Sequence, residues 1–229
     1  MILLPGLDGT GELFTPLVEN LPPMFEPVRI SYANEPVTNY DELLPQVQRR
    51  LPHDEPFILV AESFSGPLAA KIAAMRPKNL EALILCATFV ENPLPGMGWI
   101  YRFVSSWMFR LPPPRTLIRY LLAGANGSNA LVDQLLAIAW SLKPEVIASR
   151  IRLVLTVNAM QALTVCQIPI LYLRATRDKL VGSHCANRIL QLNSQAKMGE
   201  IDAPHLLLQT EPDKAISAIS HFLKSELSA

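Results

Sequence analysis

The fold of this chain is decided by residues 57–70, which read FILVAESFSGPLAA. The stretch begins with five apolar residues in a row, which is typical of a strand buried on both faces of a sheet. From Ser65 onward the pattern becomes that of a helix. Ser63 therefore lies at a sharp turn between a buried strand and a helix, and such a turn exposes its hydroxyl.

The same alternation of short apolar runs and longer amphipathic stretches extends along most of the chain. It predicts an α/β fold with six strands, all or almost all parallel, flanked by helices. The expected strands are residues 1–4, 27–32, 56–61, 80–87, 168–174 and 197–201. The expected helices are residues 14–20, 40–50, 65–75, 183–192 and 213–224, each bounded by Pro, Gly, Asn or Asp.

Composition limits the classes of function. The 229 residues are enough for one substantial core, half of them are hydrophobic, and 20 basic side chains balance 20 acidic ones. A neutral chain gives no electrostatic reason to bind nucleic acid, so an apolar or uncharged small molecule is the favoured partner. Cys86, Cys166 and Cys185 cannot all pair and lack the clustered spacing of metal sites. We expect reduced cysteines and no metal.

Two segments are candidates for a secretory signal or a membrane-spanning helix, and neither fits. Residues 1–6, MILLPG, lack the basic and long apolar regions of a secretory signal, so a cytoplasmic location is expected. Residues 153–173 carry no charge and are about as long as a bilayer-spanning helix. We expect no stable membrane insertion, because four residues in that stretch would be costly in lipid: Asn158, Gln161, Gln167 and Pro169.

Residues 91–164 interrupt the alternation, since no run in them resembles a strand. They predict a helical cap inserted into a core made of residues 1–90 and 165–229. Residues 99–109 are expected to form one helix with Trp99, Phe103 and Trp107 on a single face, ended by three prolines at 112–114. That face either packs against the core or forms a lid that binds substrate. Further helix is expected at 121–142, split at 124–128, and at 144–157.

Three other segments carry residues suited to chemistry, and each follows a predicted strand. Residues 3–11, LLPGLDGTG, form a glycine-rich loop whose backbone N–H groups can face a ligand. A phosphate-binding role fits this loop poorly, because it lacks the lysine of a P-loop and the spacing of a dinucleotide site. Asp178 lies just past the strand at 168–174. It is either functional or paired on the surface with Arg177 or Lys179.

His205 lies in the loop between the last strand and the last helix, and a loop histidine can approach a serine hydroxyl. The other three histidines, His53, His184 and His221, are better explained as surface or packing residues. Glu91, after the strand at 80–87, is a second candidate for an acid that orients His205.

Two alternatives to a nucleophilic Ser63 remain open. Ser63 can simply cap the helix that follows, which is a common role of serine. Ser65 can be the nucleophile instead, although Pro67 then occupies a place where a small, flexible residue is needed.

Taken together, residues 57–70, the loop at 3–11, Asp178 and His205 resemble the α/β-hydrolase superfamily, over about 1–89 and 167–229. The turn resembles the family's GxSxG motif, with Ala61 and Ser65 in place of the two glycines. The resemblance implies Ser63 as nucleophile, His205 as base and Asp178 as the acid that orients it. It also implies an oxyanion hole formed by the N–H groups of Leu7 and Phe64, and a core that lacks the family's first two strands.

The function implied by this resemblance is serine hydrolysis through an acyl-enzyme and without a cofactor. The aromatic and aliphatic residues of the predicted cap, with few charge pairs among them, favour carboxylic esters with an apolar acyl or alcohol part as substrates. An acyltransferase or thioesterase with the same three residues is an alternative, and so is a binding protein that has lost the chemistry. Without the first two strands, residues 27–32 become the edge of the sheet. We expect either a homodimer through this edge or its coverage by the proline-rich segments beside it.

Overall fold

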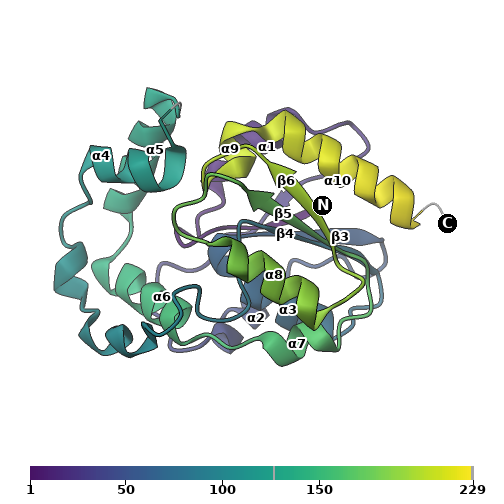
Figure 1. The fold of residues 1–229 in the computed structure, drawn as a ribbon, viewed down its shortest axis with the longest axis horizontal. Helices are drawn as coiled ribbons and strands as arrows, with labels where there is room; N and C mark the ends of the chain where they lie inside the picture. Colours follow the sequence, from purple (N-terminus) through teal and green to yellow (C-terminus); the bar gives the residue numbers. More distant parts are fainter. Residues whose placement is uncertain (126, 228–229) are drawn as a thin grey trace.

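A single parallel sheet organises the chain, with helices on both of its faces and a group of helices at one end (Figure 1). The computed structural model describes residues 1–125 and 127–227. The strands are β1 (Ile2–Leu4), β2 (Val28–Arg29), β3 (Phe57–Glu62), β4 (Leu80–Cys86), β5 (Ile170–Ala175) and β6 (Lys197–Ile201). All six pair in parallel, in the order β2-β1-β3-β4-β5-β6, which confirms the predicted fold class.

The strand order creates a switch point between β1 and β3. The chain leaves β1 toward β2 on one side, whereas it leaves β3 toward β4 on the other. Loops that depart in opposite directions open a crevice at the carboxyl ends of the two strands, where α/β proteins bind ligands. The glycine-rich loop follows β1 and Ser63 follows β3, so both predicted elements lie at this crevice.

Side chains of β3 alternate between two hydrophobic layers. Phe57, Leu59 and Ala61 join one layer, and Ile58 and Val60 join the other. Successive side chains of a strand point to opposite faces, so a strand covered on both sides must be apolar at every position.

Helices cover the two faces of the sheet separately (Figure 1). One face carries α1 (Thr15–Glu19), α9 (Leu207–Thr210) and α10 (Pro212–Leu227), with the 3-10 helix η1 (Glu12–Phe14) beside them. The other carries α2 (Leu44–Gln48), α3 (Gly66–Ala74), α7 (Met160–Thr164) and α8 (Ser183–Leu192). Two short 3-10 helices precede elements of that layer, η2 (Tyr40–Glu42) and η3 (Ser63–Ser65).

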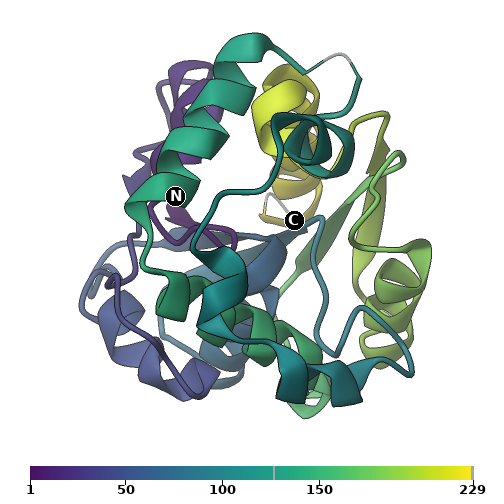
Figure 2. The same ribbon diagram turned by 90° about the vertical axis from the view of Figure 1, so that its left-hand side faces the viewer.

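Residues 98–125 and 127–156 form the group of helices at the end of the sheet (Figures 1 and 2). They comprise η4 (Gly98–Phe103), η5 (Ser106–Phe109), α4 (Arg115–Ile118), the π-helix η6 (Arg119–Ala123), α5 (Asn129–Ser141) and α6 (Pro144–Thr156). An isolated β-bridge between Glu91 and Asn158 lies where the chain leaves the core and returns to it. The break between η6 and α5 and the start of α6 at Pro144 agree with the sequence.

The predicted helix over residues 99–109 is wrong, because the chain there forms two separate 3-10 helices. They are separated at Val104, whose backbone is extended at φ −68° and ψ 113°. The carbonyl oxygen of Val104 accepts hydrogen bonds from Arg152 Nε at 2.9 Å and Nη2 at 2.5 Å. A carbonyl held by another helix is not available to continue its own helix.

The edge of the sheet is also shorter than predicted, because β2 has two residues instead of the six expected at 27–32. Beyond it, the Tyr32 N–H turns toward the loop after β1 and donates to the Gly9 carbonyl at 2.7 Å. A very short edge strand offers few free backbone groups for pairing with another chain. The sheet therefore does not require a partner or a proline-rich cover at this edge, and a homodimer stays a prediction.

The three cysteines are buried and unpaired, as expected. The uncharged stretch at 153–173 is divided among α6, α7 and β5. Within residues 1–125 and 127–227, every helix is too short or too polar to cross a bilayer.

Gly66, the first residue of α3, sets how closely α3 approaches the segment that follows β4. A Cβ atom here would overlap Thr88 Oγ1 and lie 2.9 Å from the Phe89 carbonyl oxygen. We expect Gly66→Ala to lower the free energy of unfolding by about 1–3 kcal/mol, the usual cost of overpacking a buried contact. Urea denaturation measures the loss.

The matched control for this substitution is Gly96→Ala, where the added Cβ meets nothing within 4 Å and only the positive φ of 77° opposes alanine. That backbone cost is about 1 kcal/mol. An equal effect of the two substitutions would contradict a packing role for Gly66.

Candidate active site

Ser63 occupies a strained turn at the end of β3. Its φ is +48°, in the left-handed region that residues other than glycine rarely adopt. Neither η3 nor α3 receives a capping hydrogen bond from a serine side chain. Ser63 therefore does not act as a helix cap. The strain instead directs the Ser63 side chain toward the crevice.

Ser65 has a different role from Ser63. It is completely buried, and its hydroxyl lies 2.6 Å from Tyr32 Oη and donates to the carbonyl oxygen of Pro5. Pro5 belongs to the glycine-rich loop after β1, so this serine connects that loop to the turn. The close approach of helix and strand is met by Gly66, one residue later than in the GxSxG pattern.

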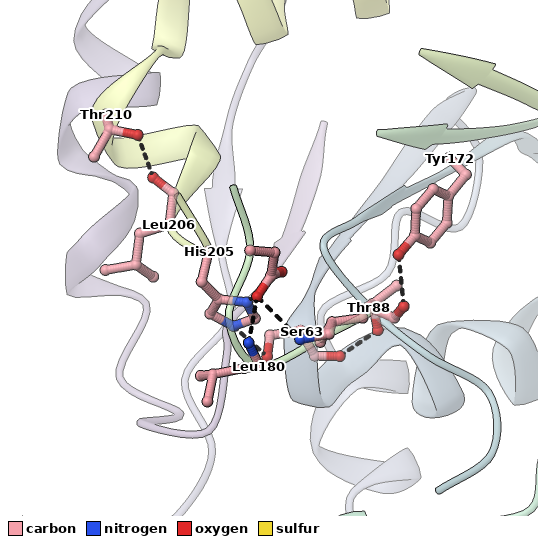
Figure 3. A network of polar contacts seen from close by, with 9 residues as sticks. Ser63, Thr88, Tyr172, Leu180, His205, Leu206 and Thr210 are labelled. Carbon is pink, nitrogen blue, oxygen red and sulfur yellow. Dashed lines mark hydrogen bonds and ion pairs between the residues drawn. The ribbon is translucent and has the colours of Figure 1, made fainter. Parts of the chain in front are cut away.

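His205 lies beside Ser63 (Figure 3), and Asp178 binds His205 on its other side, although the two residues come from the loops after β6 and β5. His205 Nε2 lies 2.9 Å from Ser63 Oγ, and Nδ1 lies 2.7 Å from Asp178 Oδ2. A carboxylate only accepts hydrogen bonds, so Nδ1 carries the proton and Nε2 is left to accept one from the serine. This arrangement suits a histidine that removes the serine proton.

Asp178 is held in place by its other oxygen. Oδ1 accepts the N–H groups of Leu180 at 2.7 Å and Val181 at 3.0 Å. The surface pairing considered for Asp178 is absent among the described residues, since Arg177 pairs with Asp202 at 2.7 Å. The second candidate acid, Glu91, pairs with Arg188 at 3.1 Å instead of contacting His205.

The backbone on either side of the turn is fixed by three side chains that sequence reasoning missed. Thr88 Oγ1 donates to the Ser63 carbonyl oxygen, and Tyr40 Oη donates to the Phe64 carbonyl oxygen at 3.0 Å. Tyr172 Oη in turn donates to the Thr88 carbonyl oxygen at 2.8 Å (Figure 3). Because these bonds orient the peptide groups around Phe64, they also set where its N–H points.

Arg150 of α6 performs the same task for the glycine-rich loop. Its guanidinium is buried and donates to the carbonyl oxygens of Leu7 at 3.0 Å, Asp8 at 2.6 Å and Ala33 at 3.2 Å. A Cβ atom on Gly9 would lie within 2.8 Å of this guanidinium, so the loop needs glycine there. No pattern in the sequence singled out Arg150, because its three partners are more than a hundred residues away.

Glu62, next to Ser63, is a buried carboxyl that the sequence did not single out. Its Oε2 accepts a hydrogen bond from Gln209 at 3.2 Å, and its Oε1 has no partner among the described residues. Burial raises the pKa of Glu62 from 4.5 to about 7, against a smaller opposing effect of His205. Glu62 is therefore uncharged at mildly acidic pH.

This pKa shift predicts a pH dependence of stability. Between pH 4.5 and about 7 the unfolded chain has lost the Glu62 proton while the folded chain keeps it, so the free energy of unfolding falls as pH rises. The loss amounts to about 3 kcal/mol. Glu62→Gln, which does not titrate, is expected to remove it. Urea denaturation at several pH values measures this, with exposed Glu81→Gln as control; equal pH profiles of native protein and Glu62→Gln would contradict the prediction.

A cavity of about 490 Å³ opens onto Ser63 and His205, with Leu7 and Phe64 also in its wall. Its lining is mainly aliphatic and comes from both the core and the helices at its end, including Ile118, Leu135, Ile138, Ile147 and Ile151. Apolar cavities of this size bind apolar parts of small molecules.

The predicted substrate contacts of Trp99, Phe103 and Trp107 are corrected by the structure. These side chains are 61%, 68% and 67% exposed and are not part of the cavity wall. The break at Val104 removes the common helix face on which the prediction relied. The later residues Phe109 and Leu111 line the cavity in their place.

The described residues hold no cluster of His, Cys, Asp and Glu side chains that could bind a metal ion. Chemically, the site offers a serine hydroxyl, a histidine able to take its proton, and a buried carboxylate behind the histidine. Leu7 and Phe64, the residues predicted to form the oxyanion hole, line the same cavity.

Comparisons with known proteins agree with this architecture. The family model described as Serine aminopeptidase, S33, matches residues 26–197. An enol-lactonase from Burkholderia xenovorans LB400 has 15% identity and a TM-score of 0.80, over 97% of this chain and 90% of its own. A thermophilic esterase from Thermogutta terrifontis has 19% identity and a TM-score of 0.82, over 98% and 89%.

A putative aryl esterase from Burkholderia cenocepacia is similar over 100% of this chain and 91% of its own, with 18% identity and a TM-score of 0.78. A search of curated protein sequences gives no significant match. The solved structures share the fold with this chain.

Proposed function

Since the chain belongs to the serine aminopeptidase S33 family and has the α/β-hydrolase fold, we propose that it is a serine hydrolase of carboxylic esters with an apolar acyl or alcohol part. The observation that carries the proposal is the chain of contacts from Ser63 through His205 to Asp178, at the wall of an apolar cavity. No single residue of the three would support it alone.

In the proposed reaction, His205 Nε2 takes the proton of Ser63 as Oγ attacks the acyl carbonyl carbon. The N–H groups of Leu7 and Phe64 stabilise the negative oxygen of the tetrahedral intermediate. His205 then returns the proton to the leaving alcohol, and an ester of Ser63 with the acyl group remains. Water attacks this ester, again with His205 as base, and releases the acid. Asp178 stabilises the imidazolium in both halves.

The lining of the cavity favours esters over the peptides that the family name suggests. An aminopeptidase must bind the ammonium group at the start of its substrate, which calls for a free carboxylate. Of the two carboxyl groups in the cavity wall, Glu62 is uncharged below about pH 7, and Asp8 binds Thr10 through Oδ2, which accepts the backbone N–H at 2.9 Å and the hydroxyl at 2.6 Å. Lys179 in the cavity wall would repel an ammonium group. The enol-lactonase and esterases that share the fold are consistent with this choice.

A fluorophosphonate probe followed by mass spectrometry of the labelled peptide tests the proposal. We expect the label on Ser63 in the native protein and in Ser65→Ala, since Ser65 is buried away from the cavity. Folded native protein that takes no label would contradict a serine hydrolase and favour a binding protein.

Turnover of p-nitrophenyl esters of increasing acyl length then tests the substrate class. We expect kcat/KM to rise with chain length until the cavity is filled, because each buried methylene adds favourable burial. Equal rates along the series would contradict an apolar acyl site. Faster turnover of an amino-acid p-nitroanilide would favour an aminopeptidase, and faster transfer to an added alcohol than to water would favour an acyltransferase.

A further inference from the structure

The helices at the end of the sheet expose a set of large apolar side chains that the proposed chemistry does not use. We call this set the apolar strap; its members are Met97, Trp99, Phe103, Trp107, Met108 and Leu111, each at least 45% exposed. Trp99 and Phe103 pack edge to face against each other at 5.8 Å and remain open to solvent. Large exposed apolar patches of this kind mark interaction surfaces.

The position of the strap leaves it accessible. Residues 97–111, which include η4 and η5, lie at the end of the molecule away from the C-terminus (Figures 1 and 2). Figure 2 turns this end toward the viewer. η4 and η5 pack on α6, and the six side chains of the strap stay exposed in the described part of the chain.

The charged residues of the segment that carries the strap have one sign. Residues 97–120 contain four arginines and no acidic residue, whereas the whole chain is neutral. Arg102 and Arg110 lie within the strap, are exposed, and form no ion pair in the described part of the chain. Exposed tryptophan and phenylalanine beside arginine, without acids, is the composition of segments that lie on anionic membrane surfaces.

The strap is continuous with the cavity. Phe109, Leu111 and Pro112 belong to the cavity wall, and Leu111 is 74% exposed at the same time. An acyl chain that leaves a lipid layer at the strap would therefore meet apolar side chains along its path to Ser63.

A second copy of this chain fits the strap less well than a membrane. A symmetric dimer brings the same surface patch of both copies together. Each copy would then bring Arg102 and Arg110 into the interface, and residues 97–120 of the other copy hold no carboxylate to pair with them, so the interface would collect like charges, which is costly.

We propose that the apolar strap, with Arg102 and Arg110, is a docking surface for the headgroup region of an anionic lipid membrane. The tryptophan and phenylalanine rings enter the interface, and the two arginines contact lipid phosphates. Docking aims the cavity mouth at the lipid, so that apolar esters enter from the membrane. The delivery of esters rests on the proposed function, whereas the docking does not.

Flotation with vesicles measures the docking. We expect the native protein to float with vesicles of equal parts phosphatidylcholine and phosphatidylglycerol, and to float less at high salt or with phosphatidylcholine alone. Arg102→Gln with Arg110→Gln should weaken binding about thirtyfold, since each arginine near an anionic surface contributes about a fivefold factor. Arg49→Gln with Arg50→Gln removes two exposed arginines outside the strap and should change little.

The three tryptophans provide a second readout of orientation. Trp140→Phe leaves only Trp99 and Trp107, both in the strap, as fluorophores. Trp99→Phe with Trp107→Phe leaves only Trp140, which is 62% exposed on α5. Brominated lipids should quench the first variant and leave the second unquenched.

Three outcomes would overturn the inference. They are no binding of native protein to anionic vesicles, equal quenching of the two tryptophan variants, and a dimer that is lost in the strap variants while vesicles are not bound. Ser63→Ala is expected to bind vesicles like the native protein. Docking can therefore be tested apart from catalysis. If the native protein bound vesicles but hydrolysed no ester, the docking proposal would stand and only the proposed function would be overturned.

Discussion

Replacing either Ser63 or His205 with alanine is expected to lower kcat for ester hydrolysis by about a million-fold, and replacing both is expected to cost little more. The two side chains are 2.9 Å apart and act in one proton transfer, so either loss disables the same step. The residual rate should come from the Leu7 and Phe64 N–H groups and from substrate binding.

Steady-state kinetics with a p-nitrophenyl ester measures these effects, and circular dichroism checks that each variant folds. The matched control is Ser217→Ala, which removes an exposed hydroxyl on α10, a helix that takes no part in the site. If the losses of Ser63→Ala and His205→Ala multiplied in the double variant, the two residues would not form one catalytic unit.

Asp178→Asn is expected to lower kcat by about ten-thousand-fold and to leave KM nearly unchanged. The reason lies in the two backbone N–H groups, of Leu180 and Val181, that donate to Asp178 Oδ1. They require an oxygen, so an asparagine must place its amide oxygen there and turn its NH₂ group toward His205. His205 Nδ1 must then accept a hydrogen bond, and its proton moves to Nε2, where it blocks removal of the serine proton.

Measuring kcat and KM separately tests this account, because Asp178 is not part of the cavity wall and should not contact substrate. Glu91→Gln is the matched control. Glu91 follows β4, is paired with Arg188, and should leave kcat within a few-fold of the native value. A large loss of kcat in Glu91→Gln together with a small one in Asp178→Asn would assign the acid to Glu91 instead.

The arrangement of the site also predicts which parts of the chain tolerate change. The glycine-rich loop is fixed by Arg150 of α6 and by Ser65 after β3. Helix α6 therefore contributes to the geometry at Ser63 and is more than a cover over the cavity. The strap at residues 97–111 contributes no hydrogen bond to Ser63, His205 or Asp178 within residues 1–125 and 127–227, so changes there should leave the intrinsic chemistry intact.

Secondary structure in the core could be predicted because its causes are local in the sequence. A strand covered on both faces must be apolar along its length, as β3 is from Phe57 to Ala61, and amphipathic stretches between such strands form the covering helices. The parallel sheet then brings every carboxyl end to one edge. Ser63, Asp178 and His205 could be grouped for that reason, since each directly follows a predicted strand.

Residues 97–111 could not be predicted in the same way. Their apolar spacing fits one helix, and what breaks it is the side chain of Arg152, which binds the Val104 carbonyl. Arg152 is 48 residues from Val104, and a contact between residues so far apart cannot be recognised in the local sequence pattern. As a result, the exposure of Trp99, Phe103 and Trp107 to solvent was not predicted. The short edge strand β2 has a similar cause, because the Tyr32 N–H binds the loop after β1.

By itself, the sequence determined the α/β fold, the parallel sheet and the three residues that meet at its carboxyl edge, because hydrophobic periodicity and strand order are properties of the chain. Only the tertiary structure decided how the loops of the site are held, which glycine allows helix and strand to approach, and which side chains line the cavity. Those features depend on Arg150, Gly66, Glu62 and Phe109, whose partners or surroundings come from other parts of the chain. The burial of these side chains and the contacts they make arise only when distant segments of the chain pack together. The strength of a buried hydrogen bond therefore depends on the folded molecule and cannot be read from the local sequence.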